Sequence, residues 1–154
     1  MIGLLQLFFL GCVDGLRSLT GPAVVCWAAH LGLHLAGTRL SFLDRPVTLT
    51  VFTLLAIVEL VVDKLPSTPA RTAPVGLIGR IVLGGGCGLA IASSGGIGVL
   101  FATLVASIGA AVGAFAGYSI RRAIVSQTRL PDFAIALAED AIAIAGGFLI
   151  VSRL

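Results

Sequence analysis

The chain has 154 residues, of which 58% are hydrophobic and 11% are charged, and its mean hydropathy is +1.12. Soluble proteins average roughly 25% charged residues, so this composition excludes an ordinary soluble domain and indicates an integral membrane protein. The net charge of +3 comes from basic residues dispersed among apolar segments. They form no basic stripe, so we expect the lipid bilayer and no nucleic acid as a partner.

Apolar runs bounded by charge, proline or glycine predict six helical elements in a single transmembrane domain, residues 1–154. The first apolar region, residues 2–35, is too long for one crossing of a hydrocarbon core of about 30 Å. It contains VDGLRSLTGP at 13–22, where we predict a break. The predicted elements are 2–13, about 17–35, 47–64, 77–93, 97–122 and 132–151. The fold class is therefore all-α, a polytopic membrane helix bundle with five or six membrane elements, depending on whether the short first element crosses.

Six elements divide into two sets of three, which predicts an inverted three-element repeat with a broken first helix, over residues 1–65 and 76–154. An offset of 80 residues aligns Gly15 with Gly95, Gly37 with Gly117, and Glu59 with Glu139. In a chain with 20 glycines, chance coincidence is the alternative explanation.

Basic residues near the helix ends predict the orientation. One side collects Arg17, Lys64, Arg71, Arg80, Arg121, Arg122 and Arg129, whereas the other side has Arg39, Arg45 and Arg153. The first side is predicted to be cytoplasmic, with both termini outside if the short first element crosses fully.

Four acidic residues lie inside the predicted helices. Glu59 and Asp63 are one turn apart on one face, whereas Glu139 and Asp140 are adjacent and point about 100° apart. A carboxylate near the bilayer centre costs at least about 2.5 kcal/mol, so these side chains are expected to face a shared, hydrated interior. Our hypothesis is that Glu59 and Glu139 form a permeation site supported by Asp63 and Asp140. In the alternative, the acids hold the bundle together by pairing with Arg17, Arg80 or Arg121.

The predicted break also carries polar groups. Exposed N–H groups at a helix start, with Arg17, Ser18 and Thr20, make a candidate anion site, and Asp14 with Arg17 is a candidate gate or substrate contact. The segment LPSTPART offers similar chemistry through Ser67, Thr68 and Arg71. Helix capping and headgroup contact are the alternative explanations for both segments.

Glycines at 109, 113 and 117 give one helix a flat face for close packing. The partner of Gly109, Gly113 and Gly117 is either a helix of the same chain or a helix of a second copy. We predict a homodimer, which this face would form in the second case. The three cysteines have no metal-like spacing, and we expect no metal and no cofactor. Enzyme motifs such as G-x-S-x-G and H-E-x-x-H are missing, so we predict no enzymatic activity; a membrane enzyme using the carboxylates as acid and base is a weaker possibility.

The segments GLRSLTGPAVVCWAAHLG, ELVVDKLPSTPART and ALAEDAIAIAGG resemble a family of bacterial integral-membrane proteins, the domain of unknown function 4126. The resemblance covers nearly the whole chain and implies a small multi-pass protein of the bacterial inner membrane, but it supplies no activity. It implies that the important positions include Arg17, Glu59, Asp63, Lys64, Pro66, Arg71, Glu139 and Asp140.

Two hypotheses of function follow. The leading one is a transporter or channel-like protein that moves a small solute or ion through an intramembrane acidic site. The alternative is a non-catalytic lipid-binding or scaffold protein that grips anionic headgroups through Arg17 and Arg71.

Overall fold

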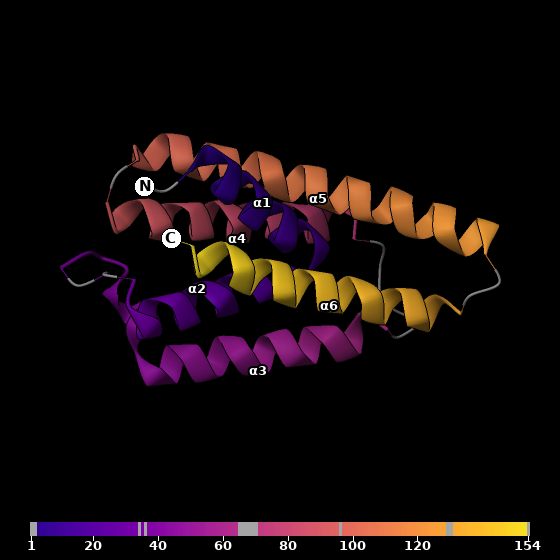
Figure 1. Cartoon of the computed structure of the whole chain (residues 1–154), viewed down its shortest axis with the longest axis horizontal. Helices are drawn as coiled ribbons and strands as arrows, with labels where there is room; N and C mark the ends of the chain where they lie inside the picture. Colours follow the sequence, from indigo (N-terminus) through magenta and orange to yellow (C-terminus); the bar gives the residue numbers. More distant parts are fainter. Residues whose placement is uncertain are drawn as a thin grey trace.

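The computed structural model describes residues 3–33, 35, 37–64, 71–95, 97–128 and 131–153, and it shows a bundle of α-helices (Figure 1). The helices are α1 (Leu4–Leu16), α2 (Thr20–Leu31), α3 (Pro46–Val62), α4 (Pro74–Ser93), α5 (Val99–Gln127) and α6 (Asp132–Val151), and a short 3-10 helix, η1, covers Ser41–Asp44. The described residues contain no β-strand. The predicted all-α bundle of six elements is therefore confirmed.

Local chemistry explains several of the helix ends. Pro46 and Pro74 occupy the first helical positions of α3 and α4, where a missing N–H group costs nothing. Gly32 ends α2 earlier than predicted because its φ of 140° is a conformation that other residues rarely adopt. Helix α5 continues to Gln127, beyond the predicted end at 122, since charged residues mark the edge of an apolar run and do not stop a helix.

The first apolar region breaks within the predicted segment. Helix α1 ends at Leu16, Arg17 has an extended backbone with φ −140° and ψ 108°, and α2 begins at Thr20. At 1.5 Å per residue, α1 and α2 are each about 20 Å long or less, shorter than a hydrocarbon core of about 30 Å. The chain reverses at the break, so α1 and α2 form a short hairpin whose tip is residues 17–19 (Figure 1).

The glycine face of α5 packs against α1 of the same chain. A methyl group added to Gly109 would overlap the carbonyl oxygen of Phe8, and one added to Gly113 would overlap that of Cys12. Figure 1 shows α1 lying along α5. Helix α1 already occupies the glycine face of α5. This face therefore cannot also be the contact between two copies of a homodimer. A homodimer would need another surface.

Gly117 lies at the end of the same face, close to the side chains of Leu16 and Arg71. It therefore marks the point where the α1–α5 contact gives way to the polar groups near the hairpin tip. The three glycines of the predicted face thus all lie against residues of the same chain.

Three of the described helices, α4, α5 and α6, are long and apolar enough to cross a membrane. Large apolar side chains also cover much of the outer surface, including Leu54, Val82 and Leu100, which are 57%, 64% and 74% exposed. Such a surface is stable against lipid and would be a liability in water. The chain is a helical, multi-pass type of membrane protein by these criteria.

The glycine matches of the predicted repeat fall in unlike structures. Gly15 and Gly117 lie inside helices, whereas Gly95 and Gly37 have positive φ values of 116° and 83° between helices. These two matches therefore do not relate equivalent positions. The inverted repeat remains a prediction that rests on the pattern of three plus three elements and on the two glutamates.

Candidate functional site

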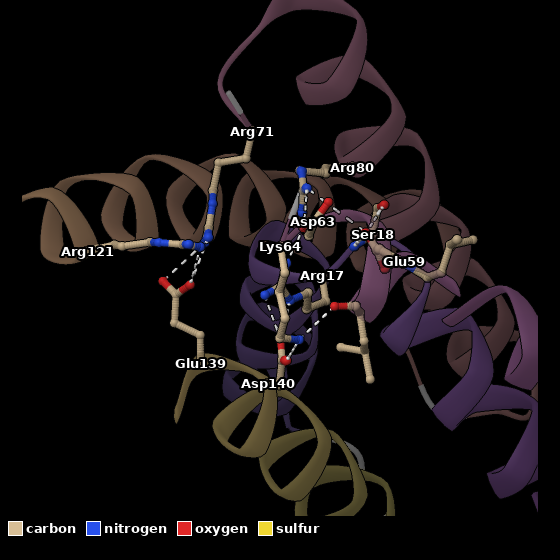
Figure 2. Close-up of polar contacts among 12 residues, drawn as sticks. Arg17, Ser18, Glu59, Asp63, Lys64, Arg71, Arg80, Arg121, Glu139 and Asp140 are labelled. Atoms are coloured by element: carbon tan, nitrogen blue, oxygen red, sulfur yellow. Dashed lines mark hydrogen bonds and ion pairs between the residues drawn. The ribbon is translucent and has the colours of Figure 1, made fainter. Parts of the chain in front are cut away.

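The tip of the α1–α2 hairpin lies in a buried network of charges (Figure 2). Arg17 follows α1 and has no exposed surface. Its Nε donates to Asp140 Oδ1 at 2.7 Å, its Nη2 lies 2.6 Å from the same oxygen, and its Nη1 pairs with Asp63. Asp63 follows α3 and Asp140 lies in α6, so one arginine joins the hairpin tip to two other helices.

Lys64 supplies a second cation to Asp140. Its Nζ lies 2.5 Å from Asp140 Oδ2 and donates to the carbonyl oxygen of Leu60 at 2.6 Å. Asp140 thus has a different cation on each carboxylate oxygen. Charge-assisted contacts of this kind are among the stronger polar interactions in proteins.

The side chain of Glu59, a residue of α3, lies at the start of α2. Its Oε1 accepts from the backbone N–H of Ser18 at 2.7 Å and from the Ser18 hydroxyl at 2.5 Å, and its Oε2 accepts from the N–H of Leu19 at 2.8 Å. These N–H groups precede a helix, where a negative charge is favoured. The anion site predicted at the break therefore exists as a set of donors, and the chain's own carboxylate fills it.

Arg80 makes the complementary contact at the end of α1. Its Nη1 donates to the carbonyl oxygen of Gly15 at 3.2 Å, and a cation is favoured at a helix C-terminus. Its Nη2 lies 3.8 Å from Asp63 Oδ2 and 4.0 Å from Glu59 Oε1. A glutamate at the start of α2 and an arginine at the end of α1 thus compensate the two interrupted helix ends.

Glu139 belongs to a second cluster, on the side facing α5. Arg71 Nη2 donates to Glu139 Oε2 at 2.8 Å, and Arg121 Nη1 lies 3.3 Å from the same oxygen. Arg121 also pairs with Asp132 at 2.6 Å, where the aspartate is largely exposed. The adjacent residues Glu139 and Asp140 therefore point to different neighbours, as their angular separation predicts (Figure 2).

The contacts differ from the expected hydrated acidic interior. Glu59 contacts Ser18, Leu19 and Arg80, whereas Glu139 contacts Arg71 and Arg121, so these contacts do not join the two glutamates into one acidic centre. Each of the four acids has at least one cation within 4.0 Å. Neither of the two described pockets is lined by an acidic residue. The cost of exposing a carboxylate to lipid predicted that the acids lie inside the bundle, but the sequence did not show which cation each acid would bind.

Asp14 and Thr20 are buried beside the network. The Asp14 carboxylate is fully buried against Gly21, and a methyl group at Gly21 would overlap it. Asp14 is not the ion-pair partner of Arg17, which binds Asp63 and Asp140. The Thr20 side chain is 3% exposed, and its hydroxyl has no hydrogen-bond partner among the residues that the structure describes.

The sequence indicated Arg17, Arg80 and Arg121 as pairing partners of the acids, and each of them pairs with at least one of the four acids in the structure. Lys64 was a candidate of the site only through the family resemblance. A basic residue within an apolar helix carries the same desolvation cost as an acid, and this signal could have indicated Arg80 as a residue of the site itself. Arg71, predicted as a headgroup contact, binds Glu139. The remaining candidates of the LPSTPART segment, Ser67 and Thr68, lie outside the described residues.

Comparisons with known proteins place the chain in a family and go no further. A family model described as "Domain of unknown function (DUF4126)" matches residues 4–152. No curated protein and no solved structure matches. The match includes all six helices and every residue of the charged network. The chain therefore belongs to the family of the domain of unknown function 4126.

Proposed function

We propose that this chain moves a small solute or ion across the membrane, and that the charges at the hairpin tip form its closed gate. We call these charges the Arg17 network; its members are Arg17, Glu59, Asp63, Lys64, Arg80 and Asp140. The observation that carries the proposal is that Arg17 is fully buried between two carboxylates from different helices. These are Asp63, directly after α3, and Asp140, in α6.

A buried network of charges and an apolar core differ in what they provide to a protein. Buried ion pairs often stabilise a fold no better than apolar side chains of similar volume, because desolvation offsets the attraction between the charges. Packing of the bundle alone therefore gives little reason to retain six buried or half-buried charges. A network does provide discrete alternative pairings, which a gate needs.

The ion pairs of the two aspartates would allow Arg17 to leave the network. Asp63 lies near both Arg17 and Arg80, and Asp140 lies near both Arg17 and Lys64. If Arg17 moves away, each aspartate keeps one cation. The network can therefore open at the hairpin tip without leaving an aspartate unpaired inside the bundle.

The hairpin is the proposed moving part. Interrupted helices at the binding site are a recurring feature of secondary transporters, where the free helix ends contact ions or substrates. Here the N–H groups of Ser18 and Leu19 bind Glu59, which holds the place that an anionic group would take. Two inverted halves and insertion in a bacterial inner membrane are part of this proposal.

The alternative of a scaffold that grips headgroups has less support. It requires the guanidinium groups of Arg17 and Arg71 to be available to lipid phosphates. Their side chains are 0% and 8% exposed, and both bind carboxylates. A headgroup would have to break these pairs first.

The substitution Glu59→Gln tests the gate. The amide side chain keeps the size of the glutamate but lacks the charge that compensates the start of α2 and faces Arg80. Hydrogen bonds to charged groups contribute about 1.5 to 3 kcal/mol, and Glu59→Gln would remove this contribution from the closed gate. We therefore expect the fraction of molecules with an open gate to rise roughly tenfold or more. The measurement is the flux of protons, alkali cations and chloride into liposomes containing the purified protein.

Asp132→Asn is the matched control, because it removes an acidic charge from a largely exposed pair at the edge of the second cluster. Its flux should equal that of the unmodified protein. The transport proposal is wrong if Glu59→Gln and Glu139→Gln both fold normally and leave every one of these fluxes unchanged.

A further inference from the structure

A small apolar groove lies between α2, α3 and α6, next to the Arg17 network. We call it the α2–α3–α6 groove; its walls include Thr20, Trp27, Ala56, Leu60, Ile144 and Phe148. Its volume is about 130 Å³. This is close to the size of the engineered apolar cavity of roughly 150 Å³ that admits benzene, so the groove has room for a segment of hydrocarbon.

The groove is continuous with the outer apolar surface. Three of its wall residues, Ile57, Ile144 and Phe148, are 52%, 39% and 39% exposed. In a membrane these side chains face lipid, since lipid is the medium that covers the outside of an apolar bundle. An occupant can therefore enter sideways from the bilayer without crossing a polar barrier.

One polar group on the wall has no partner among the described residues. The Thr20 hydroxyl is buried and makes no hydrogen bond with any of them. A buried hydroxyl without a partner is unfavourable, because it has lost its hydrogen bonds to water and gained none in return. The groove is thus matched by a molecule that is mainly apolar and carries one hydrogen-bond acceptor near Thr20.

The two ends of the groove differ in polarity. Thr20 and Leu60 lie at the network end, where the Leu60 carbonyl accepts from Lys64 Nζ. Trp27 lies two helical turns further along α2, about 10 Å away by helical rise, and donates to Thr53. The groove therefore runs from a charged end to an apolar end, as the region between a lipid headgroup and its chains does.

We propose that the α2–α3–α6 groove holds an acyl chain of a membrane phospholipid, with an ester carbonyl of that lipid accepting a hydrogen bond from Thr20. A second copy of this chain is a poorer occupant, because a helix is about 10 to 12 Å wide and cannot enter so small a space. The lipid site does not depend on transport. It sits on the outer wall of the network and would be present in a protein that moves nothing.

Trp27 is the only tryptophan in the chain and lines the groove, so its fluorescence reports directly on an occupant. Protein purified in detergent would be titrated with phosphatidylcholine and phosphatidylglycerol whose acyl chains carry bromine, which quenches tryptophan on contact. We expect quenching that saturates with lipid concentration. Ala56→Phe, which fills the groove, should raise the half-saturating concentration at least about tenfold.

Val58→Phe is the matched control, because it adds the same side chain to α3 at a 54% exposed position outside the groove wall. Its titration should match that of the unmodified protein. Equal quenching in all three proteins would mean that bulk lipid reaches Trp27 without a site, and this outcome overturns the proposal.

Thr20→Val tests the hydrogen bond without filling the groove, since valine has nearly the shape of threonine. One hydrogen bond is worth about 0.5 to 1.5 kcal/mol, so the half-saturating concentration should rise roughly 2- to 12-fold. An unchanged titration would refute the ester contact. Saturable quenching by brominated free fatty acid, with no quenching by either phospholipid, would refute a phospholipid as the occupant.

Discussion

Replacing Arg17 with methionine should lower the free energy of unfolding by about 3 to 5 kcal/mol, because it leaves the three carboxylates of the Arg17 network with only two cations, Lys64 and Arg80. Methionine keeps much of the volume of the arginine stem, so lost packing contributes little. Asp63 would retain Arg80, and Asp140 would retain Lys64, but both pairs would have to compensate charge that three cations now share. Thermal and denaturant unfolding in one detergent measure the change.

Arg122→Met is the control for this experiment. Arg122 is exposed and lies next to Arg121 in α5, so its loss should change stability by less than about 0.5 kcal/mol. A similarly small effect for Arg17→Met would mean that water already compensates the Asp63 and Asp140 carboxylates. The closed-gate proposal would then lose its physical basis, because the network would not be a buried one.

Replacing Gly113 with alanine should destabilise the bundle by about 1 to 3 kcal/mol, the range typical of overpacked cores. The added methyl group would overlap the backbone carbonyl of Cys12, and backbone cannot turn aside as a flexible side chain can. Helices α1 and α5 would have to separate along their contact. Unfolding of the purified variant in detergent measures the loss.

Gly79→Ala provides a matched comparison, because Gly79 lies inside α4 and a methyl group there would meet nothing within 4 Å among the described residues. This substitution should stabilise the protein by about 0.5 to 1 kcal/mol, since alanine favours a helix more than glycine does. Two identical chemical changes are thus expected to have opposite signs. If Gly113→Ala were as harmless as Gly79→Ala, the α1–α5 packing described above would be wrong.

Together the two experiments separate the two parts of the structure that position the hairpin. The glycine face holds α1 along most of its length through close backbone contact, a mode of association favoured in membranes where apolar side chains gain little by leaving lipid. The Arg17 network holds only the tip. A hairpin fixed along one helix and latched by charges at its end is suited to a small movement at residues 17–19.

Several features could be read from the sequence because they depend on local chemistry or on the bilayer. The apolar runs predicted the all-α bundle, since every backbone group in lipid must be paired within a helix. The break was predicted because the first apolar region exceeds one membrane thickness and contains glycines and a proline. The interior position of Glu59 and Asp140 followed from the cost of exposing a carboxylate to lipid, and both are indeed buried.

The tertiary structure decided which charges meet. Glu59 and Glu139 look alike in sequence, yet one caps the start of α2 and the other binds Arg71 and Arg121. Likewise, the spacing of Gly109 and Gly113 predicted a flat packing face but could not identify α1 as its partner. Spacing along a helix fixes only the direction in which a side chain points. The group that it contacts there belongs to a residue 41 positions away in the sequence for Glu59 and 123 positions away for Asp140, and its placement depends on how all six helices pack together.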